Sequence, residues 1–177
     1  ATSCTPCPAG TYNSASGWPS SDAVASAHDA LDKCQACPAG TYMLGTGATA
    51  CDDCQLGYYQ SGNACSKCQL GKYQDATKQT ECKVCGTGHI ATALGQTACD
   101  SCPPGKYNQY DETYAASHHQ SCTDCKKTDK TLTPPEPGEY QAQSGQDSCN
   151  DCLDPKLALT TGSAQCTTCD KVGDYST

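Results

Sequence analysis

The residues best suited to chemistry in this sequence are its 18 cysteines, all of which lie in nine Cys-x-x-Cys pairs. Such pairs hold structural zinc as thiolates, exchange disulfides as redox dithiols, or cross-link a chain after oxidation. A redox dithiol needs a thioredoxin-like βαβ context, which the sequence does not show. The 11 basic residues are all lysine and the net charge is −8, whereas zinc modules that bind nucleic acid are basic. Disulfides are therefore the favoured interpretation, with an intracellular zinc array as the alternative.

Two other groups of polar residues can be considered as ligands. His118 and His119 follow Asp111 and Glu112 and can hold a metal, although adjacent histidines on one loop are more often solvated. The carboxylates in and beside the cysteine pairs lack the D-x-D-x-D spacing of a calcium loop, so turn capping is favoured for them; they are Asp52, Asp53, Asp100, Asp124, Asp151 and Asp170. No nucleophile, base and orienting residue form a recognisable motif. We expect no catalytic residue, no metal site, no cofactor and no enzymatic activity.

The composition explains why cross-links are needed. Leu, Ile and Val are sparse and Phe is absent, so the chain cannot build an ordinary hydrophobic core. Small secreted modules with this weakness are held by disulfides instead. The acidic charge makes nucleic acid a poor partner, and no stretch is apolar enough to span a membrane. We therefore expect an oxidising, extracellular compartment.

The cysteine pairs recur with a basic period of 17 residues, which indicates a repeat array. The second cysteine of a pair begins the motif C-x-x-G-x-Y, as at Cys37-Pro-Ala-Gly40-Thr-Tyr42. Glycine suits a turn with positive φ, and a second glycine precedes the next pair. The few residues between the two turns suit short strands, although we expect loops and two-residue bridges more than regular sheet. Each tyrosine is expected to pack over a disulfide or the next module, with carbohydrate stacking as the alternative.

The full skeleton, C-x-x-C-P-x-G-x-Y followed by G-x-x-x-C-x-x-C, resembles the ephrin-receptor-like cysteine-rich repeat. Its first half is similar to the leading submodule of tumour necrosis factor receptor repeats. The match is best from Cys34 to Cys102 and departs from the pattern after Cys125 and after Cys152. The resemblance implies a small disulfide-rich fold, an elongated rod of tandem modules with short β-hairpins and mostly loop.

The resemblance also implies that the second cysteine of one pair bonds the first of the next. The implied pairs are Cys7–Cys34, Cys37–Cys51, Cys54–Cys65, Cys68–Cys82, Cys85–Cys99, Cys102–Cys122, Cys125–Cys149 and Cys152–Cys166. They delimit one continuous array over 1–177, with modules 7–34, 37–51, 54–65, 68–82, 85–99, 102–122, 125–149 and 152–166 and a partial module 169–177. Cys4 and Cys169 are left over, which suggests a window of a longer array or head-to-tail bonds between protomers.

Three modules are expanded, and expansions of an array usually emerge on one face. The insertion 13–33 contains one predicted short helix that is capped by Ser20 or Ser21 and ends near Lys33. The module 102–122 favours a turn of helix from Asp111. The insertion 126–148 contains an extended proline-rich run for which we expect O-linked glycans; the candidate sites are Thr131, Thr133, Pro134, Pro135 and Pro137.

The favoured function is an extracellular structural protein that associates with itself head-to-tail in a glycosylated fibre, appendage or surface filament. Repeats of this type occur in protist and algal surface proteins and in mastigoneme-type flagellar hairs, and the resemblance implies such a location. Two alternatives remain open, a protist surface-coat antigen and a receptor ectodomain that binds a protein ligand. Any specific contact is expected in the three long loops.

Overall fold

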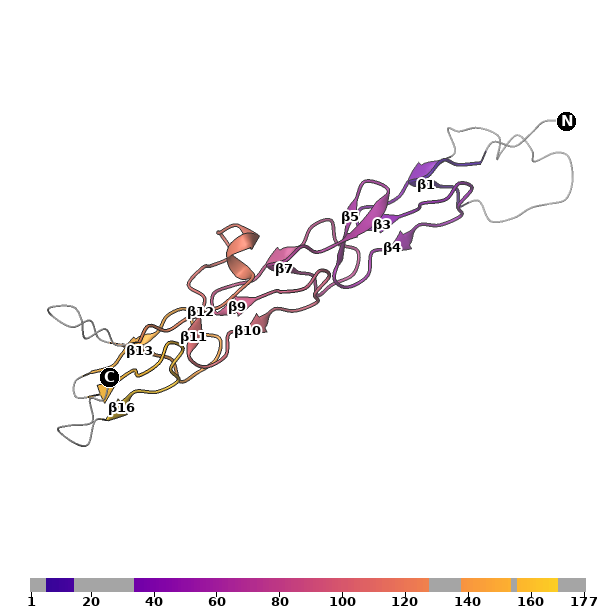
Figure 1. Cartoon of the computed structure of the whole chain (residues 1–177). Helices are drawn as coiled ribbons and strands as arrows, with labels where there is room; N and C mark the ends of the chain where they lie inside the picture. Colours follow the sequence, from indigo (N-terminus) through magenta and orange to yellow (C-terminus); the bar gives the residue numbers. More distant parts are fainter. Residues whose placement is uncertain (1–5, 15–33, 128–137, 154–155, 169–177) are drawn as a thin grey trace, which may run out of the picture. The chain divides into compact units, whose positions relative to one another are not determined.

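The computed structural model describes residues 6–14, 34–127, 138–153 and 156–168. Short strands joined by long loops make up the described chain (Figure 1), and it contains no α-helix. The predicted class, a small disulfide-rich fold of short hairpins and mostly loop, is confirmed. The helix predicted before Lys33 lies outside the described residues. The turn of helix predicted from Asp111 is a 3-10 helix, η2 (Ala116–His119), which begins five residues later.

The chain divides into two compact units. The first unit comprises Ala1–Cys68, Gln74–Cys82 and Gly95–Thr97, and the second comprises Gln69–Tyr73, Lys83–Leu94 and Ala98–Thr177. Each unit is built from the same small hairpin, so the features below recur in both.

In seven hairpins, a two-residue strand at the x-Tyr position of the motif pairs with a second strand that lies inside the next Cys-x-x-Cys pair. The antiparallel pairs are β1 (Thr11–Tyr12) with β2 (Gln35–Ala36), β3 (Thr41–Tyr42) with β4 (Asp52–Asp53), β7 (Lys72–Tyr73) with β8 (Lys83–Val84), β9 (His89–Ile90) with β10 (Asp100–Ser101), β11 (Lys106–Tyr107) with β12 (Thr123–Asp124), β13 (Glu139–Tyr140) with β14 (Asn150–Asp151), and β15 (Lys156–Leu157) with β16 (Thr167–Thr168). The second strand thus follows the second glycine turn, whereas the sequence placed short strands between the two turns.

The eighth hairpin is different. β5 (Tyr58–Ser61) and β6 (Ala64–Lys67) have four residues each, and Ser61 pairs with Ala64 across a tight turn at Gly62 and Asn63. This is the shortened module, whose cysteines are 11 residues apart instead of the 14 found in four other modules. Its hairpin has no room for the long second loop of the other modules.

The first glycine of the motif is required by both its backbone and its surroundings. Gly57 has a φ of 76°, and a Cβ built on it would lie 2.1 Å from the carbonyl oxygen of Gly95. An L-residue is strained in the left-handed region, and no side chain fits at that distance. The close approach joins a module to the second turn of the module two places later, within the first compact unit.

Backbone hydrogen bonds join each module to the next. The first glycine donates to the carbonyl that follows the next module's tyrosine position: Gly10 to Met43, Gly57 to Gln74, Gly71 to Ala91, Gly88 to Asn108 and Gly105 to Gln141, at 2.7–2.8 Å. The second-turn residue donates back to the carbonyl of the preceding module's first cysteine: Gly47 to Cys7, Lys78 to Cys54, Gly95 to Cys68, Gly145 to Cys102 and Gly162 to Cys125, at 2.8–2.9 Å. Donor and acceptor of every bond lie within the same compact unit. We call this set the inter-module ladder.

Cysteines and polar amides occupy the place of a core. The second cysteine of each described pair up to Cys152 is buried, except Cys37, which is half-buried. At the position after the tyrosine, Gln74, Asn108 and Gln141 are at most 6 % exposed, and Ala91 and Ala158 are buried at the same position. A buried polar group costs free energy unless it is hydrogen-bonded, so these amides need partners.

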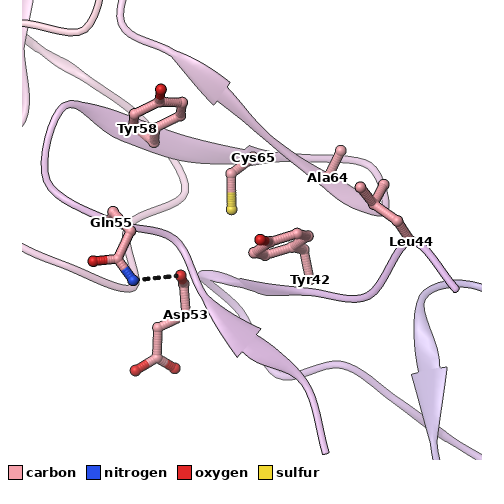
Figure 2. A pocket seen from close by; sticks show the side chains of 7 residues that line it. All are labelled: Tyr42, Leu44, Asp53, Gln55, Tyr58, Ala64 and Cys65. Carbon is pink, nitrogen blue, oxygen red and sulfur yellow. Dashed lines mark hydrogen bonds between the residues drawn. The ribbon is translucent and has the colours of Figure 1, made fainter. Parts of the chain in front are cut away.

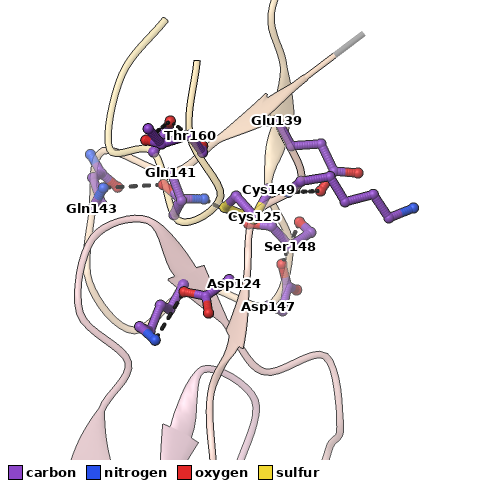
Figure 3. Close-up of a disulfide and its surroundings, with 12 residues drawn as sticks. Asp124, Cys125, Glu139, Gln141, Gln143, Asp147, Ser148, Cys149 and Thr160 are labelled. Carbon is purple, nitrogen blue, oxygen red and sulfur yellow. Dashed lines mark hydrogen bonds and ion pairs between the residues drawn. A yellow bond between two sulfur atoms is a disulfide. The ribbon is translucent and has the colours of Figure 1, made fainter. Parts of the chain in front are cut away.

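Each buried amide closes the loop of its own hairpin. Gln141 donates from Nε2 to the carbonyl of Ser148 at 2.7 Å and accepts at Oε1 from the backbone N–H of Gln143 at 3.1 Å. Figure 3 shows this side chain beside the Cys125–Cys149 disulfide. Gln74 makes the same two bonds, to Glu81 and from Ala76. The amide therefore satisfies backbone groups that a hydrophobic side chain would leave unpaired.

Candidate functional site

The structure joins sixteen cysteines in eight disulfides, with Cα–Cα distances of 5.6–5.9 Å. These are the eight pairs that the resemblance implies: Cys7–Cys34, Cys37–Cys51, Cys54–Cys65, Cys68–Cys82, Cys85–Cys99, Cys102–Cys122, Cys125–Cys149 and Cys152–Cys166. Their cysteines carry no thiol for metal ligation or exchange in this state. Such a density of disulfides indicates an extracellular or secreted protein. Cys4 and Cys169 lie outside the described residues.

The candidate glycosylation sites Thr131, Thr133, Pro134, Pro135 and Pro137 lie outside the described residues, as does Asp170. Among the described residues, no group of three or more His, Cys, Asp or Glu side chains is arranged to hold a metal ion. In the same part of the chain, no helix is long and apolar enough to cross a membrane.

The carboxylates beside the cysteine pairs lie in strands, because the residues inside each Cys-x-x-Cys pair form the second strand of a hairpin. Asp52 and Asp53 form β4, and Asp124 ends β12. Two of these carboxylates make exposed ion pairs, Asp53 with Lys78 at 3.3 Å and Asp124 with Lys106 at 2.9 Å. Turn capping is therefore wrong for these residues, since they lie in strands; the Asp124–Lys106 pair joins the two strands of one hairpin, and the Asp53–Lys78 pair joins different modules.

The loop between β11 and β12 brings the paired histidines together with two tyrosines. The ring of Tyr110 lies 5.0 Å from that of Tyr114 and 4.4 Å from that of His118, centroid to centroid. His118 is exposed, in agreement with the solvated interpretation, whereas His119 is fully buried and contradicts it. The rings pack against one another, so this cluster shapes the loop.

His119 anchors this loop through its backbone and one ring nitrogen. Its carbonyl accepts from the N–H of Ala91 at 2.8 Å, and its Nε2 lies 3.0 Å from the carbonyl oxygen of Asp111. The Asp111 carboxylate accepts bonds from the hydroxyl and the backbone N–H of Thr113, which hold its pKa below the ordinary value, with a smaller contribution from His119. The loop is thus fixed mainly by its own hydrogen bonds.

The described chain has a pocket of about 360 Å³ in the first compact unit. It lies between two consecutive modules and is lined by Tyr42, Leu44, Asp53, Gln55, Tyr58, Ala64 and Cys65. Figure 2 shows the two tyrosines around the Cys65 side chain, with Asp53 and Gln55 along one edge and Leu44 at the other end. Aromatic walls with a few polar groups are the usual composition of a small-molecule site.

Sequence reasoning missed this pocket, although it carried a signal for it. Tyr58 stands where other modules have a non-aromatic residue or a histidine, so the double tyrosine Tyr58-Tyr59 departs from the repeat. The shortened spacing from Cys54 to Cys65 marks the same module. The second tyrosine, Tyr58, beside the tyrosine that recurs in the array therefore marks this module as different.

No protein-family model matches this chain, and no curated protein sequence matches it. Conclusions about its function therefore depend on the residues and contacts described above.

Proposed function

We propose that the chain is an extracellular structural protein whose tandem disulfide-bonded modules assemble into a fibre, an appendage or a surface filament. The modules are proposed to be ephrin-receptor-like repeats, with no enzymatic activity. The observation that carries the proposal is the inter-module ladder. A module that lacks an apolar core gains hydrogen bonds from both of its neighbours, which is the energetic pattern of a repeat array.

The charge and cross-links fit this role. A net charge of −8 favours solubility and disfavours binding to nucleic acid. Each disulfide closes a local loop, and a loop of about 15 residues contributes roughly 3 kcal/mol in the chain-entropy model. The modules therefore stay folded in an exposed, oxidising setting without a large buried surface. Self-association head-to-tail, covalent glycans and a flagellar location extend the same proposal.

Electron microscopy of the purified oxidised protein tests the assembly. We expect filaments of repeating subunits at high protein concentration, which reduction of the disulfides dissolves. A chain that stays monomeric by sedimentation across the same concentrations, with all eight disulfides formed, would contradict self-assembly. The receptor alternative would then be favoured, because a receptor ectodomain needs no self-association.

A further inference from the structure

The loop between β11 and β12 takes the place that a short second turn has in other modules. Ala116 opens η2, and its carbonyl oxygen would lie 1.9 Å from a Cβ on Gly71. The carbonyl oxygens of Gly95, Gly145 and Gly162 would lie 2.0–2.1 Å from a Cβ on the first glycine of another module. Those three turns make the same close approach without an aromatic ring.

This loop nevertheless carries two tyrosines that are additional to the repeat, Tyr110 and Tyr114. Their ring centroids are 5.0 Å apart and their planes are inclined by 62°, so the edge of one ring faces the other ring. Among the tyrosines that the structure describes, no other two make a ring contact. Tyr114 is 49 % exposed, so the contact buries only part of its ring and leaves it accessible to reagents.

Hydrogen bonds of the loop hold the two tyrosines at this spacing. The buried Asn108 accepts at Oδ1 from the backbone N–H of Tyr110 at 3.0 Å. The backbone N–H of Tyr114 donates to the carbonyl of Asp111 at 3.1 Å. The Asp111 carboxylate accepts two bonds from Thr113, which lies between the two tyrosines. The phenols are therefore kept close by the folded backbone and not by chance contact of flexible side chains.

Two phenols at this distance can be joined by oxidation. A peroxidase removes one electron and one proton from each phenol, and the two phenoxyl radicals form a carbon–carbon bond between ring carbons ortho to the hydroxyls. The hydrogens on those two carbons then move to the oxygens, which restores both aromatic rings. Overall, the pair loses two hydrogen atoms, and one hydrogen peroxide takes them up and becomes two waters. The oxidising compartment that the disulfides indicate is compatible with this chemistry.

We propose that Tyr110 and Tyr114 are the site of an intramolecular dityrosine cross-link, formed by an extracellular peroxidase and hydrogen peroxide. The ring of the half-exposed Tyr114 can rotate, which brings an ortho carbon to the edge of Tyr110 while the backbone stays in place. The bond closes the loop whose residues Ala116 and His119 contact the two preceding modules, at Gly71 and at the N–H of Ala91. The proposal does not depend on filament assembly.

Peroxidase treatment of the full, disulfide-bonded chain tests the proposal. The chain is treated with a haem peroxidase and hydrogen peroxide, its disulfides are then reduced, and a protease cleaves it after glutamate. Cleavage after Glu112 separates Tyr110 from Tyr114, so the two peptides stay joined only through the new bond. We expect joined peptides that have lost two hydrogen atoms and show dityrosine fluorescence.

Three substitutions by phenylalanine locate the bond, because each removes one phenol and keeps its ring. Tyr110→Phe and Tyr114→Phe should each abolish the joined peptides. Tyr107→Phe is the matched control: Tyr107 lies nearer to Tyr110 in the sequence than Tyr114 does, but its ring makes no contact with that of Tyr110 among the described residues. It should leave the yield unchanged. At micromolar protein, the linked pair should exceed dimers between chains about tenfold or more, since a tethered partner has a millimolar effective concentration.

The outcome decides the proposal in each case. Joined peptides that require Tyr110 and Tyr114 but not Tyr107, and that are also present in the protein purified from its source, support the cross-link. The proposal is overturned if the two peptides separate completely after treatment, if Tyr107→Phe lowers the yield as much as Tyr114→Phe does, or if the protein from its source lacks the bond. The dispersed amide spectrum of each variant, recorded before treatment, reports whether it is folded.

Discussion

The two glycine turns of the shortened module allow the close approach between modules to be tested separately from backbone conformation. Gly57 and Gly62 both have positive φ, at 76° and 63°. A Cβ on Gly57 would lie 2.1 Å from the carbonyl oxygen of Gly95, whereas a Cβ on Gly62 would meet nothing within 4 Å. Gly45 has neither constraint, since nothing lies within 4 Å of its Cβ and its φ is not in the left-handed region. The three alanine substitutions therefore form a graded series within one compact unit.

The expected costs follow from separate physical causes. An alanine in the left-handed region costs about 1–2 kcal/mol, offset by about 0.4–1 kcal/mol because alanine restricts the unfolded chain. Gly62→Ala should therefore lose about 1 kcal/mol, and Gly45→Ala should be neutral or slightly stabilising. Gly57→Ala must also push the second turn away and weaken two ladder bonds of 2.8 Å, from Gly57 to Gln74 and from Gly95 to Cys68. At about 1 kcal/mol per bond, with added overpacking, its loss should reach about 3–4 kcal/mol.

Guanidinium unfolding of the oxidised variants, followed by near-ultraviolet circular dichroism of the tyrosines, measures these free energies. Hydrogen exchange at the amides of Gly57 and Gly95 should show the largest loss of protection in Gly57→Ala. Non-reducing peptide maps must show the same disulfides in every variant. Equal losses in Gly57→Ala and Gly62→Ala, within about 0.5 kcal/mol, would refute the reasoning, because the close approach would then contribute nothing.

Four further results are expected. Gln74→Ala should lower the free energy of unfolding by about 2–3 kcal/mol, because it leaves the carbonyl of Glu81 and the N–H of Ala76 unpaired. Alanine at the exposed Gln69 should change this free energy little. Similar losses for both variants would contradict the role of the buried amides. The pKa of Asp111 in the folded chain is lowered from 3.8, so its carboxylate stabilises the β11–β12 loop above pH 3.8. This stabilisation is lost as the pH falls through the lowered pKa. NMR signals of Tyr110 and Tyr114 should report the change, and Asp111→Asn should abolish this pH dependence. Non-reducing peptide mapping should find Cys54 linked to Cys65 and Cys68 linked to Cys82, and a Cys65–Cys68 link would exclude the ladder as described. If Cys4 and Cys169 join protomers head-to-tail, a non-reducing gel shows a series of multimers that Cys4→Ser removes; a single monomer band for the unaltered chain would rule out that bond.

The spacing of cysteine, glycine and tyrosine predicts the module and its first strand, but it does not predict the second strand with which that strand pairs. Cys37, Gly40 and Tyr42 mark the turn and the first strand, because each of these residue types has a distinct conformational or covalent role. The second strand lies inside the next cysteine pair, as at Asp52–Asp53, where variable and mostly polar residues give no strand signal. Its pairing depends on the disulfide and on backbone contacts, which single residues do not reveal.

The buried amides were also beyond sequence reasoning, since Gln and Asn are usually exposed. Gln74 and Gln141 look like surface residues until the loop that each one closes is known. Lys78 is a similar case. It has a φ of 60° at a position where four other modules have glycine, and it keeps the ladder bond to Cys54. The contacts of the array therefore determine a backbone conformation that the residue itself disfavours.

The way this fold is stabilised also bears on where its function can lie. Disulfides, ladder bonds between backbone groups and a few amides hold each module, so most outward side chains are not needed for folding. The residue before the tyrosine in C-x-x-G-x-Y accordingly varies from Lys72 to Lys106 to Glu139 within one chain. A single substitution at such a position, as at Tyr58, can create a pocket without loss of the fold. The three long loops were the predicted contact sites; 15–33 of the first and 128–137 of the third lie outside the described residues. Among the described modules, the strongest candidate for specific binding is instead the one that departs from the repeat by being shorter.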